Sequence, residues 1–262
     1  MRRPVITLTT DFGLSDHFVG VMKGVILGIC PAAEIVDITH EVNAFEVAEG
    51  AFAVAQAYRY FPRKTVHIVV IDPGVGTSRR PILAEAAGQL FVAPDNGVLS
   101  LILAREKHRV RAVTAEKYFL KNASQTFHGR DIFAPVGARL ACGVTPARMG
   151  KLITDFLRPH LELPARTARR AWTGVVLKID RFGNLITNFP IADFPDLAER
   201  PFQVSIGMQT VSRLARNYAE SAPGELFFIA GSSGYLEISS NQASAAKILG
   251  CGVGAPVELR IF

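Results

Sequence analysis

Short runs of β-branched and apolar residues alternate with helical patterns between Val5 and Val113. This alternation is typical of βαβ units, so we predict an N-terminal α/β sandwich domain built on a mostly parallel sheet. The third run is apolar almost throughout, as expected of a central strand that is covered on both faces. The predicted strands span residues 5–8, 35–38, 66–71, 90–92 and 110–113.

Helical periodicity fills the gaps between these strands. Asp16 is expected to cap a first helix, whose apolar residues lie on one face and which ends before Pro31. A second helix is expected over residues 44–60, and a third begins near Asp131, which we expect to cap it. Thr145, followed by a proline, predicts a further short helix.

The pattern changes after Arg158. From there to Arg170 the sequence is rich in proline and arginine and has no periodicity, which is typical of an interdomain linker. The apolar runs beyond it are short and separated by Gly, Pro, Asn or Ser, as in a small antiparallel barrel or sandwich. We therefore predict an α/β domain over residues 1–160 and a smaller, antiparallel β-barrel-like domain over residues 171–262. The strands expected in the second domain span residues 175–179, 186–189, 202–206, 226–229, 235–238 and 257–262.

Composition places the chain among compact globular proteins, because 49% of its 262 residues are hydrophobic and only 20% are charged. No apolar stretch is long enough to span a bilayer, so we expect no membrane partner. The three cysteines, Cys30, Cys142 and Cys251, are far apart and odd in number. We therefore expect neither a disulfide framework nor a zinc site, and a reducing cytoplasm fits this usage best.

The net charge of +6 would suit an anionic partner, but the basic residues are scattered. The exceptions are Arg63-Lys64, Arg79-Arg80 and the stretch over residues 166–170. A nucleic-acid binder should also show aromatic residues interleaved with a basic stripe, and none is visible. We interpret the positive charge as a property of the surface that keeps the protein in solution, and we expect no nucleic-acid partner.

Polar residues follow several of the predicted strands in the N-terminal half. In open parallel sheets, functional groups gather just beyond the carboxyl ends of the strands, where Asp11, Asp37, Asp72 and Asp95 are expected. A single carboxylate in such a place is often only a turn former. Several at one sheet edge would repel one another unless a shared polar ligand, such as a ribose, uses them together.

The turn after Asp72 carries two glycines, Gly74 and Gly76. It lacks the remaining residues of a P-loop or a dinucleotide fingerprint, so a phosphate site has little support. The turn reverses the chain and would bring Arg79 back to Asp72 as an ion pair. A salt bridge that only stabilises the turn is the alternative.

His128 lies on a polar loop and is followed by a glycine, which leaves room for a ligand. We interpret His17, His40, His67, His108 and His160 as structural. No zinc-motif spacing, nucleophile elbow or cysteine–histidine pair is present, so we expect no metal, no cofactor and no covalent catalysis. In the second domain, Phe182 lies between polar residues and could stack on a flat heterocycle while Asn184 contacts its edge.

Together these segments resemble the S-adenosyl-L-methionine hydroxide adenosyltransferase family, in order and across both domains. The matching segments are residues 9–13, 72–79, 93–97, 127–131 and 180–184. The resemblance implies hydrolysis of S-adenosyl-L-methionine to adenosine and L-methionine by attack of water or hydroxide at the ribose C5′. It implies Asp72, Arg79 and His128 as the catalytic set. It also implies a homotrimer whose active sites lie between the N-terminal domain of one subunit and the C-terminal domain of the next.

The resemblance also implies substrate contacts. Asp11 would hold the ribose hydroxyls, Asp180, Ser232 and Ser233 the methionine end, and Phe182, Asn184 and Gln242 the adenine side. The other substrate-binding candidates are Phe12, Asp95, Asn96, Tyr235 and Asn241.

Three alternatives remain open at this point. The family shares its fold with fluorinase and chlorinase enzymes, in which a halide replaces water, and in those relatives arginines take the positions of Ser233 and Ser240. The fluorinase motif also carries other residues where this chain has Asp72, Arg79 and His128. A halide-dependent adenosyltransferase, a metal-dependent nucleoside hydrolase and a non-catalytic adenosine-binding module are therefore the rival functions.

Overall fold

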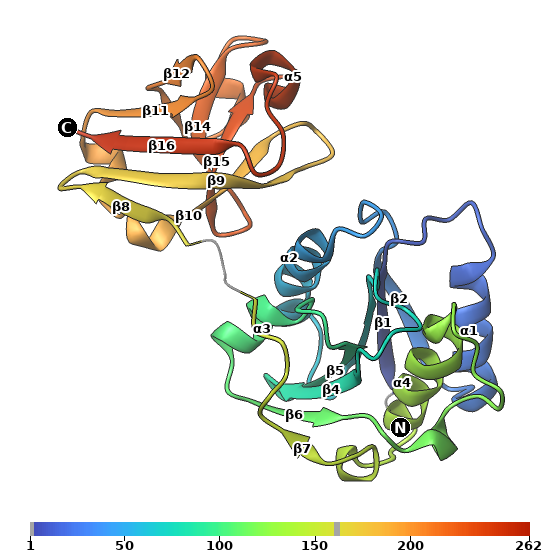
Figure 1. Cartoon of the computed structure of the whole chain (residues 1–262). Coiled ribbons are helices and arrows are strands. Elements are labelled where there is room, and N and C mark those ends of the chain that lie inside the picture. Colours follow the sequence, from blue (N-terminus) through green and yellow to red (C-terminus); the bar gives the residue numbers. More distant parts are fainter. Residues whose placement is uncertain (1–2, 160–162) are drawn as a thin grey trace. The chain divides into compact units, whose positions relative to one another are not determined.

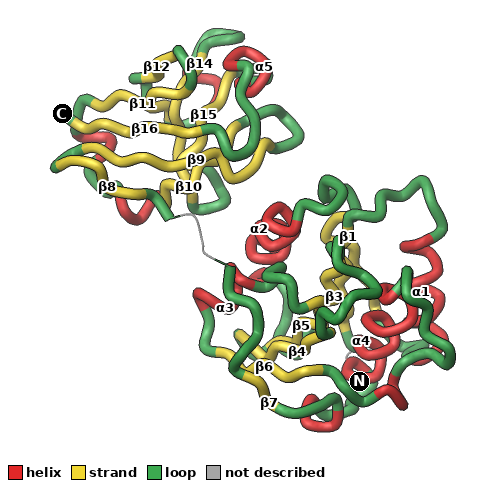
Figure 2. The backbone as a smooth tube through the Cα atoms, viewed as in Figure 1, coloured by secondary structure: helices red, strands yellow, loops and turns green. Residues whose placement is uncertain are grey.

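The computed structural model describes residues 3–159 and 163–262. Two compact units are present, Met1–His160 and Leu161–Phe262, and each contains its own sheet. The secondary structure is mixed α/β, and nearly all of the helix lies in the N-terminal unit (Figure 2).

The N-terminal unit is a seven-stranded sheet with helices on both faces (Figure 1). Helices α1 and α4 pack on one face, over a core that includes Met22, Ile68 and Phe133, and helices α2 and α3 pack on the other. The strand order is β2-β1-β3-β5-β4-β6-β7. The strands are β1 (Val5–Thr10), β2 (Glu34–Thr39), β3 (Val66–Val70), β4 (Pro81–Ala86), β5 (Gln89–Pro94), β6 (His108–Ala112) and β7 (Leu152–Ile153). The helices are α1 (Phe18–Ile29), α2 (Val47–Ala57), α3 (Ser100–Arg105) and α4 (Ala134–Ala141).

Only half of this sheet is parallel. Strands β2, β1, β3 and β5 run parallel, with β3 fully buried as its apolar sequence predicted. Strands β4, β6 and β7 pair antiparallel. The strand predicted near residues 110–113 is present as β6, but it runs antiparallel to its neighbours and not parallel to them. The reason is β4, an unpredicted strand that turns directly into β5 through Ala87 and Gly88, both of which have positive φ.

The helix starts differ from the predicted caps. The residue at the N-cap of α1 is His17 and not Asp16, and no side chain caps that end. Asp131 does not cap a helix either, because it lies buried inside a π-helical turn, Gly129–Phe133, that continues directly into α4. Its carboxylate accepts instead from Arg130 and from the Ser124 backbone N–H.

The expectation of no disulfide is also wrong. Cys30 and Cys142 form a disulfide, with 5.8 Å between their Cα atoms, while Cys251 is free. The two residues are the C-caps of α1 and α4, which pack side by side and so bring their ends together. A pair 112 residues apart leaves no trace in sequence spacing.

The C-terminal unit is a curled half-barrel of strands around a main apolar core, with a single short α-helix in the part of the chain that the structure describes. Its strand order is β12-β11-β16-β9-β10-β15-β14-β13, and β8 pairs with β9. Strand β8 lies in the segment predicted as a linker. All pairs are antiparallel except β13 with β14. The elements are β8 (Ala165–Ala168), β9 (Ala171–Ile179), β10 (Leu185–Pro190), β11 (Phe202–Ile206), β12 (Gln209–Val211), β13 (Leu214–Ala215), β14 (Leu226–Ala230), β15 (Tyr235–Ser240), α5 (Ala245–Leu249) and β16 (Pro256–Ile261).

Candidate active site

Asp72 and Arg79 face each other across the turn that follows β3. The Arg79 Nε–H donates to Oδ1 of Asp72 at 2.9 Å, and Nη2 donates to Oδ2 of the same carboxylate. Both side chains are buried, with 5% of Asp72 and 9% of Arg79 exposed. The expected ion pair is therefore present and bidentate, and it is shielded from solvent.

Glycine at position 76 lets this turn touch the loop that carries His128. Gly76 has a φ of +78°, and a Cβ there would lie 2.4 Å from the carbonyl oxygen of Gln125. No other residue fits both the backbone conformation and the space. The close approach aligns the two loops, which are about 50 residues apart in the chain.

His128 completes the cluster by accepting a hydrogen bond from Arg79. Nη2 of Arg79 donates to Nδ1 of His128 over 2.6 Å. A guanidinium has only donors, so Nδ1 must be unprotonated and the imidazole neutral, with its proton on Nε2. The Arg79 guanidinium also lies over the Phe133 ring, 5.4 Å from its centroid, which fixes its plane.

Electrostatics keep this imidazole neutral. Burial lowers the pKa of His128, and the positive charge of Arg79 lowers it further, against smaller raising effects from Asp72, Asp131 and the Ser124 backbone. At neutral pH the group is therefore a free base held against a guanidinium. Its only lone pair, on Nδ1, is engaged by Arg79, so the imidazole can accept a proton in a reaction only as it gives up that hydrogen bond.

Asp11 lies next to the cluster. Burial raises the pKa of Asp11, the Phe45 backbone N–H lowers it, and the negative charge of Asp72 adds a further increase. The Phe45 N–H donates to Oδ2 of Asp11 at 2.9 Å, and the backbone N–H of Asp11 itself also stabilises the carboxylate. Phe12, the next residue, packs against Phe18 and Phe127. It therefore supports the loop that carries His128, and its predicted contact with substrate stays a prediction.

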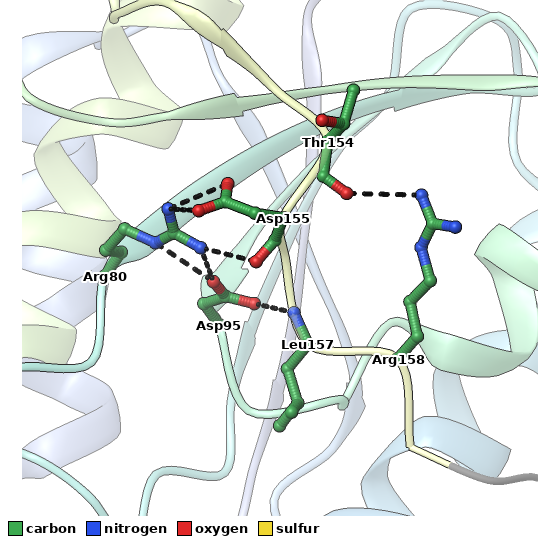
Figure 3. A network of polar contacts seen from close by, with 6 residues as sticks. All are labelled: Arg80, Asp95, Thr154, Asp155, Leu157 and Arg158. Carbon is green, nitrogen blue, oxygen red and sulfur yellow. Dashed lines mark hydrogen bonds and ion pairs between the residues drawn. The ribbon is translucent and has the colours of Figure 1, made fainter.

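Asp95 and Asn96 are engaged within the protein. Asp95 accepts from Arg80 and from the Leu157 backbone N–H, and Arg80 also binds Asp155 (Figure 3). These contacts hold the segment after β7 against the end of β5. Asn96 donates from Nδ2 to the Ile71 carbonyl at 2.7 Å. Both residues thus position the loops around Asp72, and direct substrate contacts for them remain predictions.

The candidates of the C-terminal unit include a tight turn between β9 and β10. Asp180 accepts from the backbone N–H groups of Phe182 and Asn184, both at 2.9 Å, and from Nδ2 of Asn184 at 2.8 Å. Gly183, with a φ of +88°, closes the turn against Ser244. The turn leaves the Phe182 ring 79% exposed, while Asn184 is buried. An exposed ring beside a fixed amide suits a flat heterocycle.

The remaining candidates lie at the tip and the end of β15. Ser232 and Ser233 belong to the hairpin turn between β14 and β15, which Gly231 and Gly234 close through a backbone hydrogen bond. Asn241 donates from Nδ2 to the Ser221 carbonyl, and the exposed Gln242 has a positive φ of 55°. The candidates of the C-terminal unit, Asp180, Phe182, Asn184, Ser232, Ser233, Tyr235, Asn241 and Gln242, thus belong to two turns and to β15 with its exit.

Sequence analysis missed Glu237 in the middle of β15. This side chain is 5% exposed, and Ser233 donates to its Oε1 at 3.4 Å. Burial raises the pKa of Glu237, and the negative charge of Asp180 raises it further. The sequence signal was a glutamate between Leu236 and Ile238 on a buried strand, which is uncommon.

Two further histidines lie buried in the N-terminal unit. His40 and His67 are buried and hydrogen-bonded to Thr10 and Thr7, and burial lowers the pKa of His67 to about 4. His160 lies outside the described residues.

Within residues 3–159 and 163–262, no three His, Cys, Asp or Glu side chains lie close enough together to hold a metal ion. No helix in the same residues is long and apolar enough to cross a bilayer.

Comparison with known domains gives two matches that follow the two units. Residues 6–150 match the SAM hydroxide adenosyltransferase N-terminal domain, and residues 174–258 match the corresponding C-terminal domain.

Whole-chain relatives agree with this assignment. The (R)-S-adenosyl-L-methionine hydrolase of Salinispora tropica is 39% identical over 96% of this chain and 95% of its own. A crystal structure of an uncharacterized conserved protein from Thermotoga maritima superposes with a TM-score of 0.91 at 38% identity, covering 97% and 99% of the two chains. A fluorinase from Nocardia brasiliensis is more distant, at 27% identity over 99% of this chain and 98% of its own.

Proposed function

The chain belongs to the SAM hydroxide adenosyltransferase family, and from this premise we propose that it hydrolyses S-adenosyl-L-methionine to adenosine and L-methionine. The observation that carries the proposal is the cluster of Asp72, Arg79 and His128, in which one guanidinium contacts both a carboxylate and a neutral imidazole. Hydrolases of this name share more of the sequence than the fluorinases do.

The reaction makes one demand on the protein. Attack of the water oxygen at C5′ forms a C–O bond, while the electrons of the C–S bond return to sulfur, which leaves as a neutral thioether. The leaving group therefore needs no proton. The attacking water must lose one, and it must be held in line with the C–S bond.

Arg79 is suited to hold that water. Its Nε and Nη2 groups are engaged by Asp72 and His128, whereas Nη1 has no hydrogen bond within the described residues. We assign Nη1 to the water or hydroxide oxygen, with Asp72 fixing the guanidinium. The proton that the water loses can pass to Nδ1 of His128 as that nitrogen gives up its hydrogen bond from Arg79. Asp11 is assigned to the ribose hydroxyls.

The C-terminal unit supplies the contacts to adenine and to the methionine end of the substrate in this proposal. Asn184 and the exposed Phe182 ring would bind adenine, with Gln242 at its edge, and Asp180 and the serines of the β14–β15 turn would bind the methionine end. We propose a homotrimer in which the N-terminal unit of one subunit and the C-terminal unit of the next complete each site.

One product analysis separates the rival functions. The purified protein is incubated with S-adenosyl-L-methionine, with and without chloride or EDTA, and the products are identified by mass. We expect adenosine and L-methionine under every condition. A 5′-halogenated nucleoside would identify a halide-dependent transferase, loss of activity with EDTA a metal-dependent hydrolase, and unchanged substrate a binding module.

Mixing of inactive subunits tests the shared site. Arg79→Ala protein and Asn184→Ala protein each carry one damaged half of the proposed site. After co-refolding, mixed trimers would contain sites in which both halves are intact, so activity should return to a substantial fraction of the wild-type value. No recovery in mixed trimers shown to form by native mass spectrometry would place the whole site within one subunit. The cytoplasmic location and the absence of a cofactor stay predictions from the sequence.

A further inference from the structure

A cavity of about 270 Å³ lies in the C-terminal unit at the turn between β8 and β9. Its apolar lining includes Trp172 and the buried side chains of Phe194 and Leu197. Its charged lining consists of Arg166, Arg169, Arg170, Arg200, Asp193 and Asp196. The basic stretch over residues 166–170 thus forms one wall of the cavity. None of the lining residues belongs to the candidate active site, so the proposed hydrolysis leaves this feature without a role.

Arg166 is held in place at this cavity by its own turn. Its Nε donates to the carbonyl oxygen of Ala168 at 3.2 Å, and Nη2 donates to the carbonyl oxygen of Arg169. The guanidinium lies over the Trp172 ring, 5.6 Å from its centroid, and that ring packs edge-to-face against Phe194. Nη1 of Arg166 has no hydrogen bond within the described residues. A guanidinium fixed in this way on an aromatic ring is preorganised to bind a further partner through its remaining donor.

The other three arginines of the cavity lack a carboxylate partner in the part of the chain that the structure describes. The guanidinium groups of Arg169, Arg170 and Arg200 form no ion pair there. Elsewhere in the same unit, Arg213 and Arg260 each pair with a glutamate. Guanidinium groups do not lose their charge in proteins, so deprotonation cannot relieve the repulsion among them. A bound anion can relieve it.

Charge and size together indicate which anion suits the cavity. Four arginines and two aspartates line it, so the lining carries a net charge of +2, and an anion with two or more negative charges would neutralise it. The volume of about 270 Å³ lies just below the range of about 300–1,000 Å³ that is usual for small-molecule sites, which favours a small anion. Guanidinium groups bind phosphate oxygens through pairs of N–H donors.

We propose that this cavity binds a small phosphate-bearing anion with at least two negative charges, of which inorganic pyrophosphate is the simplest. Arg169, Arg170 and Arg200 donate to the phosphate oxygens. Arg166 stays on the Trp172 ring and donates through Nη1. The anion thereby connects the β8–β9 turn to the segment that precedes β11. The site does not depend on the hydrolysis of S-adenosyl-L-methionine, so it stands or falls separately from the proposed function.

Calorimetry on the full chain tests the proposal with pyrophosphate as the probe, at constant ionic strength. We expect saturable binding to wild type and a dissociation constant about tenfold higher or more in the double variant Arg169→Ala/Arg200→Ala, because charged hydrogen bonds to phosphate are lost. The matched control, Arg213→Ala/Arg260→Ala, removes the same charge from the same unit and should bind as wild type does. Equal weakening in the two double variants, or no binding to wild type, would overturn the proposal.

Trp172 provides a second measurement, which locates the anion on wild-type protein even if no variant folds. It is the only tryptophan of the chain, so its emission reports on this cavity. Pyrophosphate should change that emission to saturation, because it draws on the guanidinium that lies over the ring. Binding heat without a change in emission would place pyrophosphate elsewhere and overturn the proposal.

The source of the phosphate is distinguished by titrating tripolyphosphate and ATP in the same way. Tighter binding of tripolyphosphate would assign the cavity to an inorganic anion, and tighter binding of ATP would assign it to a phosphate ester. A single-stranded oligonucleotide that binds while pyrophosphate does not would identify a nucleic-acid surface and would refute the small-anion site.

Discussion

The two units differ in how their buried carboxylates are held. In the N-terminal unit, the Asp72 carboxylate is matched by Arg79, which also fixes His128. In the C-terminal unit, Asp180 accepts from the backbone and side chain of its own turn, and Glu237 accepts from Ser233. The difference indicates that the N-terminal unit holds the preorganised charged groups that act on the reacting atoms.

Breaking the compensated cluster should have the largest effect. Arg79→Ala should lower kcat/KM by on the order of 10³-fold, because the group that holds the nucleophile and fixes His128 is lost. Arg79→Lys should not restore activity, since an ammonium cannot bind Asp72 in two places and His128 as well.

The neighbouring arginine is the control for this experiment. Arg80 joins Asp95 to Asp155 (Figure 3), so Arg80→Ala should lower the melting temperature while the folded protein keeps its kcat. Equal kcat losses in the two variants would show that the Arg79 effect is only structural.

The disulfide tests whether the two units also differ in how they are stabilised. Reduction of Cys30–Cys142 should lower the free energy of unfolding of the N-terminal unit by about 2–4 kcal/mol, since the bond closes a long loop. Hydrogen exchange should then rise in α1 and α4 and stay unchanged in β9, β10 and β15. Cys251→Ser, in the other unit, should have no such effect. Faster exchange throughout the chain would show that the units are not independently stable.

The smallest expected effect is a shift along the pH axis. His128 must be neutral to accept from Arg79, and burial and Arg79 lower its pKa below the ordinary value of 6.5. Activity should therefore hold as pH falls through 6.5 and decline only below it, by about tenfold per pH unit once His128 protonates. In Arg79→Ala, the histidine pKa followed by NMR should rise. If kcat already falls with decreasing pH above pH 7, the protonation of a group other than His128 causes the loss of activity in acid.

Local patterns gave the positions of most of the longer strands but not of β4, β7, β8, β12 and β13, and the turn after Asp72 correctly predicted the Asp72–Arg79 pair. The direction of a strand and the pairing of residues far apart in the chain could not be predicted from these local patterns. The antiparallel sense of β6 depends on β4, and the disulfide depends on how α1 packs against α4. Glu237 was missed because the pKa of its carboxyl is raised by burial and by the charge of Asp180, on another turn, and local patterns show neither.

The π-helical turn Gly129–Phe133 makes chain length, more than residue identity, the determinant of where His128 points. Such a turn accommodates one residue more than an α-helical turn. Deleting a single residue within it would convert it to regular α-helix and rotate His128 about the helix axis by roughly 100°. The imidazole would then leave Nη2 of Arg79 although every side chain of the cluster remained. Deletion of one residue in this segment would therefore inactivate the enzyme in one step.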